Sequence, residues 1–365
     1  MISRAFEILS RRIDGPLMAA LALTVALGIT VVYSASGGSS VERLAGQFRN
    51  LGVALLAMWL LAHVHPQFLM RLALPVYLVG LSLLVGVAFF GEIRNGARRW
   101  LNLGFTTIQP SEIMKIAVPL ALAWYFHRRE EGLRLRDFAI AGVILAVPFA
   151  LVLRQPDLGT AMLIGAAGFF VIFLAGLSWK IIISAGVAGL ASLPFVWSML
   201  HDYQRQRVLT LLDPSTDPLG AGYHIIQATI AIGSGGVLGK GWLNGTQAQL
   251  DFVPERSTDF ILAVYGEEFG LIGNIVLVTL YLLIIGRGLM IAANASTVFS
   301  RLAAGAITLS FFVYAFVNMG MVTGILPVVG VPLPMVSYGG TALLSILAGM
   351  GILMSISTHK QLVAS

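Results

Sequence analysis

The chain has 365 residues, of which 57% are apolar, and a net charge of +6. Charged residues make up only 11% of it, against roughly 25% in a typical soluble domain, so the composition excludes a soluble globular protein and predicts a polytopic membrane protein. The absence of cysteine excludes disulfides and cysteine metal sites. The basic residues lie in short loops without a nucleic-acid motif, so no nucleic-acid partner is expected.

Ten apolar stretches approach the length of about 20 residues that a helix needs to cross a bilayer. The predicted spans are 16–35, 46–64, 70–90, 110–127, 138–154, 157–176, 180–200, 259–286, 299–323 and 340–357. We therefore predict an all-α polytopic membrane protein of about ten transmembrane helices, forming a single membrane domain over residues 1–365. The first span is longer than the core of a signal peptide, about 7–15 residues, which favours an uncleaved helix.

Ten spans place both termini on the same side of the membrane. The 23 lysines and arginines divide almost equally between the two sides, so their number does not decide the orientation. The basic N-terminal arm and the dense segment 127–136 favour cytoplasmic termini. This orientation gives two outer loops, 91–111 and 201–258, the second a large extracytoplasmic loop between helices 7 and 8. Loops longer than about 12–15 residues are usually functional or disordered.

The first outer loop and the start of the next helix carry a group of charges. Arg98 and Arg99 would lie at headgroup level, where arginine suits either phosphate recognition or lipid anchoring. Glu112 and Lys115 are three residues apart and share a helix face. They form either a mutually neutralising pair or a polar site in which the lysine meets an anionic group.

The short connection RQPDLGT, at 154–160, contains two further candidates. Asp157 either caps the following helix or orients Arg154 or binds a cation. The sequence leaves these alternatives open.

The stretch FVPERSTDFILAVYGEEFG, at 252–270, has a polar cluster followed by an apolar run with two carboxylates inside it. We expect Ser257 or Thr258 to cap a helix with Asp259 in its first turn, where the helix dipole favours a carboxylate. The alternative is a general base at the membrane surface. On the helix face below Asp259 lies a stripe of small residues, formed by Ala263, Gly266, Gly270 and Gly273. This small-residue stripe either seats another helix or leaves a groove for a ligand tail.

Glu267 and Glu268 are adjacent, so they cannot both share the face of Asp259. Charges at membrane depth are costly, and we expect both to face the protein interior and to contact polar groups. Further along, residues 318–342 contain three prolines and several glycines. Irregular backbone at membrane depth must be buried in protein or line a cavity.

Together these stretches resemble the SEDS family (shape, elongation, division, sporulation), most closely its RodA branch. Residues 318–342 resemble the family signature along their whole length, including Ser337. GARRWLNLGFTTIQPSEIMKIA, RQPDLGTA and 252–270 are also RodA-like. The resemblance covers nearly all of the chain, and its length and short ends favour RodA over the division relative FtsW.

The resemblance implies a peptidoglycan glycosyltransferase for cell elongation and rod shape. Such enzymes polymerise lipid II, a disaccharide-peptide on undecaprenyl pyrophosphate, at the outer face of the bacterial cytoplasmic (inner) membrane. The implied partners are a class B penicillin-binding protein, which is a transpeptidase, and other elongation-complex membrane proteins. The essential aspartate of the family maps onto Asp259, and its membrane glutamate and lysine map onto Glu112 and Lys115.

The residues suit this chemistry, with Asp259 taking a proton from the acceptor hydroxyl in a direct displacement that gives a β-1,4 link. The pyrophosphate leaving group needs positive charge, and the outer-side candidates are Arg98, Arg99, Lys115, Arg154, Arg205, Arg207, Lys240 and Arg256. Further substrate-binding candidates are Asp157, Glu255 and Ser337. A divalent cation, Mg²⁺ or Mn²⁺, could assist; no other cofactor is expected, and the sequence assigns no metal ligands.

Two other functions fit the composition. A lipid II flippase would need a polar path through the membrane, to which Glu267, Glu268 and Asn318 could contribute. However, no internal repeat typical of transporters is visible, and the polar residues outside the spans concentrate on the outer side. A scaffold that only holds a partner synthase is the third alternative.

Overall fold

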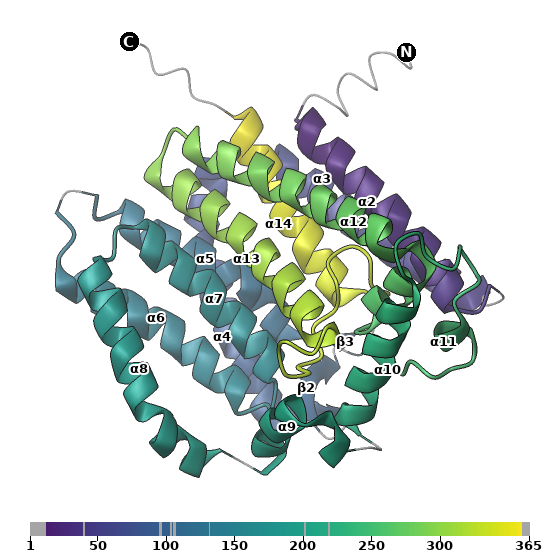
Figure 1. Cartoon of the computed structure of the whole chain (residues 1–365). Helices are drawn as coiled ribbons and strands as arrows, with labels where there is room; N and C mark the ends of the chain where they lie inside the picture. The colour runs from purple at the N-terminus through teal and green to yellow at the C-terminus, as the bar shows by residue number, and fades with distance from the viewer. Residues whose placement is uncertain are drawn as a thin grey trace, which may run out of the picture.

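A computed structural model describes residues 12–38, 41–94, 97–102, 104, 107–130, 132–200, 202–217 and 220–359. A helix lies over each of the ten predicted spans within this part of the chain. These helices are α2 (Gly15–Ala35), α3 (Val41–His63), α4 (Pro66–Phe90), α5 (Pro110–His127), α6 (Leu135–Leu153), α7 (Leu158–Leu174), α8 (Trp179–Met199), α12 (Ile261–Ala293), α13 (Val298–Val322) and α14 (Thr341–Thr358). Both ends of the described chain lie at the same end of the bundle (Figure 1).

Seven of the described helices, α2, α3, α4, α6, α12, α13 and α14, are long and apolar enough to cross a membrane. The all-helical polytopic membrane fold is therefore confirmed, while the count of ten spans stays a prediction. Several helix starts follow directly from the sequence. Asp14 caps α2 by accepting from the amide of Leu17, with proline in the first turn. Thr297 caps α13 by accepting from the amide of Ser300.

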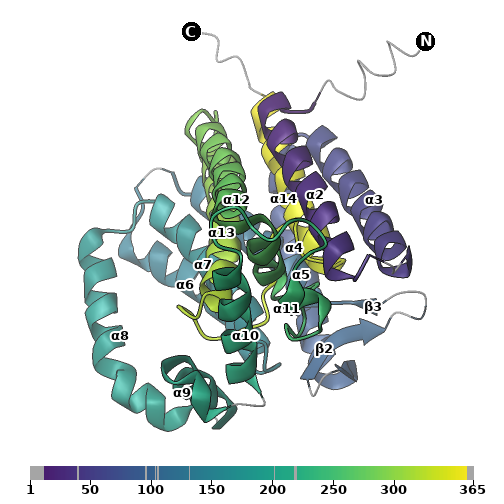
Figure 2. The ribbon, with the colours of Figure 1, turned by 45° about the vertical axis from the view of Figure 1, so that its right-hand side comes forward.

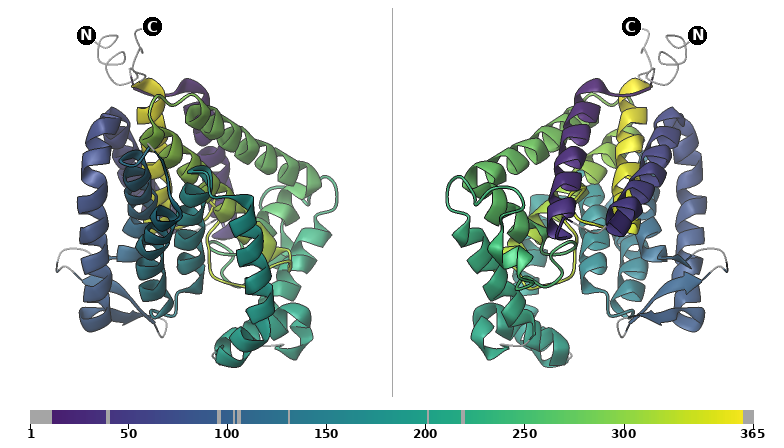
Figure 3. Two further views of the ribbon diagram at one scale, coloured as in Figure 1. Left: turned by 90° about the vertical axis from the view of Figure 1, so that its left-hand side faces the viewer. Right: turned by 90° about the vertical axis from the view of Figure 1, so that its right-hand side faces the viewer.

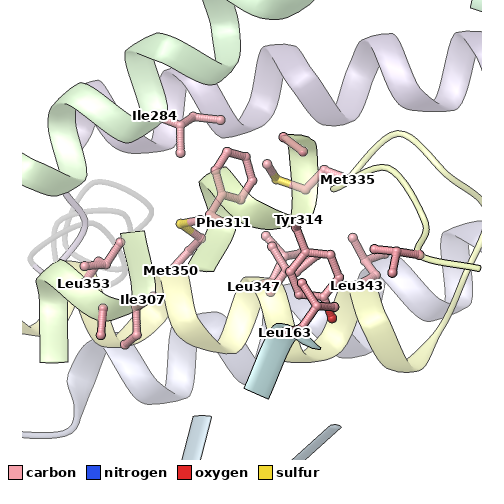
Figure 4. Close-up of a cluster of buried hydrophobic side chains, with 14 of the residues drawn as sticks. Leu163, Ile284, Ile307, Phe311, Tyr314, Met335, Leu343, Leu347, Met350 and Leu353 are labelled. Atoms are coloured by element: carbon pink, nitrogen blue, oxygen red, sulfur yellow. The ribbon is translucent and has the colours of Figure 1, made fainter. Parts of the chain in front are cut away.

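The centre of the bundle is formed by α13 and α14, whose apolar windows are 67% and 61% buried. Figure 4 shows one part of this core, where Phe311, Tyr314, Leu347 and Met350 pack together. By contrast, α8 has no buried side chain among those described. It stands at the periphery, apart from α10 and α13 in Figure 2, so most of its surface is available to lipid.

The first predicted outer loop is not irregular. It contains strands β1 (Glu92–Arg94), β2 (Ala97–Asn102) and β3 (Thr107–Ile108), paired antiparallel in the order β1-β2-β3. The strands are too short for a period-two pattern to stand out in the sequence. The sheet projects at the end of the bundle opposite the termini (Figure 3).

Residues between α8 and α12 also form regular elements: α9 (Asp202–Leu212), the 3-10 helix η1 (Pro214–Thr216), α10 (Ala221–Ser234) and α11 (Thr246–Gln249). The glycine-rich segment 235–241, which follows α10, lies against α12 where Gly270 interrupts the helix with φ 63° and ψ −158°. Amides of Lys240 and Gly241 donate to the carbonyls of Glu267 and Glu268, both at 3.0 Å. The segment therefore satisfies backbone groups that the kink leaves without helical partners.

The small-residue stripe therefore seats a helix in part: α10 packs on it at Gly266, where an added Cβ would lie 3.6 Å from the Cα atom of Ile232, and the glycine segment covers it at Gly270. A Cβ on Gly270 would lie 2.4 Å from the amide nitrogen of Gly239, and a Cβ on Gly235 would lie 2.1 Å from the carbonyl oxygen of Gly266. Only glycine permits such a close approach, and only glycine readily adopts the backbone of residue 270.

Replacing Gly270 by alanine is expected to destabilise the protein by about 3 kcal/mol, from backbone strain and the clash with segment 235–241. Thermal unfolding of the purified protein in detergent measures the change. The matched control is Gly286→Ala in the same helix, where an added Cβ meets nothing within 4 Å. The control should be neutral or slightly stabilising, and equal stability of both variants would contradict the role given to the kink.

Candidate active site

Asp259 lies in a turn just before α12, not in the first turn of the helix as the sequence suggested. The helix begins at Ile261, and its N-cap is Phe260, which makes no side-chain capping bond. Neither Ser257 nor Thr258 is the N-cap: the Thr258 hydroxyl bonds to Glu255, and the carbonyl groups of both residues accept hydrogen bonds from another segment. Asp259 therefore sits on a loop whose shape is fixed from outside the helix.

The segment that fixes it is 324–340, the proline- and glycine-rich stretch between α13 and α14. The Ser337 hydroxyl donates to the carbonyl of Thr258 at 2.6 Å and accepts from the amide of Leu333 at 2.7 Å. The amide of Tyr338 donates to the carbonyl of Ser257 at 2.8 Å. Ser337 is buried, so its observed contacts position the Asp259 turn.

Asn318 of α13 supplies a second support. Its side-chain amide donates to the carbonyl of Asp259 at 2.9 Å and to that of Val331 at 2.7 Å. Gly330 has φ +69°, and a Cβ on it would lie 3.4 Å from the Oδ2 atom of Asp259. The carboxylate thus lies beside segment 324–340 while its side chain stays partly exposed.

The surroundings of Asp259 change its acidity. Burial, and secondarily the negative charge of Glu255, raise the pKa of Asp259 to about 6. A base with such a pKa is largely ionised at neutral pH and still binds a proton well, which is the compromise that general-base catalysis favours.

The start of α7 lies on the other side of the same segment. Asp157 caps this helix by accepting from the amide of Thr160 at 3.1 Å, which is the first of the three alternatives predicted. A Cβ on Gly159 would lie 2.6 Å from the carbonyl oxygen of Val329. Residues 329–331 are therefore enclosed between the α7 start and Asp259, which brings the RQPDLGT connection into the candidate site.

Arg99 of β2 joins the site through this connection. Its guanidinium donates to the carbonyl of Pro156 at 2.6 Å and lies 3.8 Å from the Asp157 carboxylate. The side chain is still 34% exposed, so it can meet a ligand. The neighbouring Arg98 is exposed and donates weakly to Ala88, at 3.4 Å, and Arg154 is exposed at the end of α6.

Glu112 and Lys115 form a buried pair in α5. The Nζ atom of Lys115 is 2.6 Å from Glu112 Oε1, and the side chains are 9% and 12% exposed, in that order. Lys115 also donates to the hydroxyl of Tyr314, and Ser345 donates to Glu112 Oε2 at 2.7 Å. The first predicted alternative, mutual neutralisation, describes the observed contacts, and the pair connects α5 with α13 and α14.

The remaining cations contact other groups. Lys240 pairs with Glu267 at 2.7 Å. Arg256 pairs with Asp251 at 2.5 Å and donates to the carbonyl of Ala248. Arg205 donates to backbone carbonyls at the end of α8. The side chain of Arg207 lies outside the described residues.

The two carboxylates inside α12 are buried, as expected, and the structure supplies their partners. Glu267 is 0% exposed and accepts from Lys240, Thr246 and two backbone amides of α11. Glu268 is 1% exposed and accepts from Ser34 of α2. They join α12 to the outer segment and to α2, which the sequence could not indicate.

Sequence reasoning gave too little weight to Asn318 and missed His224. An amide inside an apolar span was the available signal for Asn318. The ring of His224, on α10, packs on Phe260 with centroids 5.4 Å apart. An isolated histidine in a long segment is a weak signal, because a side chain of this kind is often structural.

The described residues contain no group of three or more histidine, cysteine or acidic side chains that could hold a metal ion. Mg²⁺ is usually held by one or two carboxylates together with substrate phosphates. Asp259 and Glu255, whose charges interact, match that smaller requirement.

Comparisons with known proteins agree on one family. The family model FTSW_RODA_SPOVE, described as a cell cycle protein, matches residues 16–362. Peptidoglycan glycosyltransferase MrdB of Escherichia coli K12 is 52% identical over 355 residues, covering 96% of this chain and 95% of that protein. A probable peptidoglycan glycosyltransferase FtsW of Geobacter metallireducens is 37% identical over 360 residues, covering 94% of each chain.

Solved structures show the same likeness. One match is a chain of a peptidoglycan synthase complex, whose structure is described as showing the structural coordination of polymerization and crosslinking. It has a TM-score of 0.83 and 35% identity, and the match covers 96% of this chain and 99% of that one. The rod shape determining protein RodA of Thermus thermophilus matches with a TM-score of 0.73 and 29% identity, covering 96% and 98%.

Proposed function

The chain belongs to the FtsW, RodA and SpoVE family of cell cycle proteins, and we propose that it polymerises lipid II into glycan strands with Asp259 as the general base. It is a peptidoglycan glycosyltransferase of the RodA type. The assignment of Asp259 rests on the state of its carboxylate, which is partly exposed, lies against segment 324–340 and has a pKa of about 6. A residue that only served the helix dipole would need none of these three features.

In this mechanism, Asp259 accepts the proton of the acceptor sugar hydroxyl as that oxygen attacks the anomeric carbon of the donor. The bond to the undecaprenyl pyrophosphate breaks in the same displacement, so the configuration inverts and a β-1,4 link forms. The leaving group carries its own charge and needs cations, not a general acid. Preorganised charge aimed at a developing anion is usually a large catalytic contribution.

Arg99 is the best placed cation for this task, because it is bonded to the α7 start, which packs on segment 324–340 beside Asp259, and its side chain remains accessible. Two further arginines are also exposed: Arg98, which adjoins Arg99, and Arg154, which lies three residues before Asp157. Lys115, Lys240 and Arg256 already meet carboxylates, so we assign them to positioning. If Mg²⁺ or Mn²⁺ takes part, Glu255 and Asp259 would hold it, and it would supply positive charge to the pyrophosphate.

The protein is a multi-pass membrane protein, and we place it in the bacterial cytoplasmic membrane with cytoplasmic termini and the Asp259 end outside. We also propose a class B penicillin-binding protein as partner, together with other elongation-complex membrane proteins. Support comes from the likeness to a chain of a peptidoglycan synthase complex that coordinates polymerization and crosslinking.

A flippase is not favoured, because the polar residues that would have formed its path are occupied. Glu267 is bonded to Lys240 and α11, and the amide of Asn318 is bonded to two backbone carbonyls. Purified protein with labelled lipid II separates the functions. A polymerase gives chains on a gel; lipid scrambling without chains would instead support a flippase, and activity in neither assay unless the partner is added would support a scaffold or an enzyme that the partner activates.

A further inference from the structure

At the end of the bundle that carries the termini, opposite Asp259, the structure contains a cavity of about 310 Å³. It lies between the first turns of α4 and α13 and the last turns of α5 and α14, which the views of Figure 3 place at the same end. Its wall includes the buried side chains of Phe299, Ser300 and Ile356. The catalytic proposal uses none of these residues.

The cavity is built for a negatively charged group. Its lining includes Arg71 and the three histidines His65, His127 and His359, and no aspartate or glutamate among the described residues that line it. Arginine recognises phosphate through paired hydrogen bonds. The cavity is also next to Thr297, the N-cap of α13, where the helix dipole favours an anion.

The three histidines use their Nδ1 atoms in two different ways. The Nδ1 atom of His65 accepts from the amide of Gln67 at 3.2 Å, and that of His359 lies 3.0 Å from the carbonyl oxygen of Ser355. The Nδ1 atom of His127 lies 2.6 Å from Glu130. Because its Nδ1 accepts, His65 carries its proton on Nε2 and can donate to an anion there, whereas His127 and His359 donate through Nδ1 and their Nε2 atoms donate only when the ring is protonated.

A second cavity, of about 610 Å³, continues from the first and shares Met70, Arg71 and His127 with it. Its further lining includes Leu74 and Pro75 of α4, which add an apolar wall. Trp124 and Arg128 complete it, and the Arg128 guanidinium lies 4.9 Å from the centre of the Trp124 ring. Indole and guanidinium groups at helix ends are typical of the headgroup level of a membrane.

We propose that the two joined cavities bind one anionic phospholipid of the leaflet on the termini side, with its phosphate in the first cavity and an acyl chain along Leu74 and Pro75. Basic pockets between helices on the cytoplasmic side suit such headgroups. A soluble phosphate compound would have no use for the apolar wall. A zwitterionic lipid would bring a cation, whereas the described lining contains no carboxylate and the neighbouring Glu130 is already paired with His127.

The test uses the full chain in phosphatidylcholine nanodiscs with increasing phosphatidylglycerol, and counts retained lipid by native mass spectrometry after detergent extraction. Wild type should retain one phosphatidylglycerol. Arg71→Gln should bind it about fivefold more weakly and Arg71→Gln/Arg128→Gln about 25-fold, from roughly fivefold per charge. Arg136→Gln changes an exposed arginine that lines neither cavity and should retain the lipid as wild type does. Arg71→Lys keeps the positive charge and should recover part of the binding that Arg71→Gln loses.

Three results would overturn the proposal: retention by the double variant equal to wild type, equal loss in Arg136→Gln, or equal retention of phosphatidylcholine. Displacement of phosphatidylglycerol from both wild type and Arg136→Gln by free glycerol phosphate would overturn the lipid and support a soluble phosphate compound instead. The variants change exposed side chains, and an unaltered unfolding temperature in pure phosphatidylcholine shows that each is folded.

Discussion

Replacing Asp259 by asparagine should lower kcat/KM for lipid II polymerisation by a factor of about 10²–10⁴, the usual contribution of a general base. Asparagine keeps the size of the side chain and the contact with Gly330, but it cannot accept the proton of the acceptor hydroxyl. The measurement is the rate of glycan chain formation by purified protein, with the partner transpeptidase present.

The control is Asp202→Asn, which makes the same chemical change at a fully exposed carboxylate in α9 and should leave the rate near that of wild type. Lipid II binding by Asp259→Asn should persist, because the loss concerns the chemical step. A wild-type rate in a correctly folded Asp259→Asn protein would remove Asp259 from the role of base.

Replacing Lys115 by methionine should destabilise the protein by about 3–5 kcal/mol, the cost of leaving a buried charge without its partner. Glu112 would keep only the hydrogen bond from Ser345 at a site where its side chain is 12% exposed. Thermal unfolding in detergent measures the loss, and Lys180→Met, at an exposed lysine of α8, is the matched control.

The double variant Glu112→Gln/Lys115→Met distinguishes pairing from ligand binding. If the two residues act on stability only through each other, the double variant should recover most of the stability lost by Lys115→Met. It should then also recover activity, unless the lysine contacts the substrate. Equal instability of the single and double variants would show that Lys115 stabilises the bundle through Tyr314 or other groups.

Much of the bundle could be predicted from the sequence, because apolar length alone marks a membrane helix. The predicted 110–127 coincides with α5, and 157–176 agrees with α7 to within two residues at each end. The start of α12 was misplaced since Ser257 and Thr258 are strong capping residues in isolation. Their bonds to Ser337 and Tyr338 depend on a chain segment distant in sequence, which local pattern does not contain.

The candidate site, too, could be predicted from the sequence only in part. Asp259 was identified through the family resemblance and the polar cluster around it, whereas its contact with Gly330 and the burial that raises its pKa arise only when segment 324–340 packs against its turn. The partners of Glu267 and the inserted glycine segment 235–241 could not be predicted either. Periodicity describes which face of α12 is small, but not which distant segment fills it.

The pH dependence of kcat/KM, compared between wild type and Glu255→Gln from about pH 4.5 to 8, tests the role of Asp259 most directly. The free base must be ionised, so the wild-type rate should be constant at neutral pH and fall as the pH drops through about 6. Removing the Glu255 charge should move this inflection to lower pH, while burial keeps it above the ordinary aspartate value of 3.8. An inflection that stays in place in Glu255→Gln, or a wild-type rate that does not fall below pH 6, would contradict the assignment.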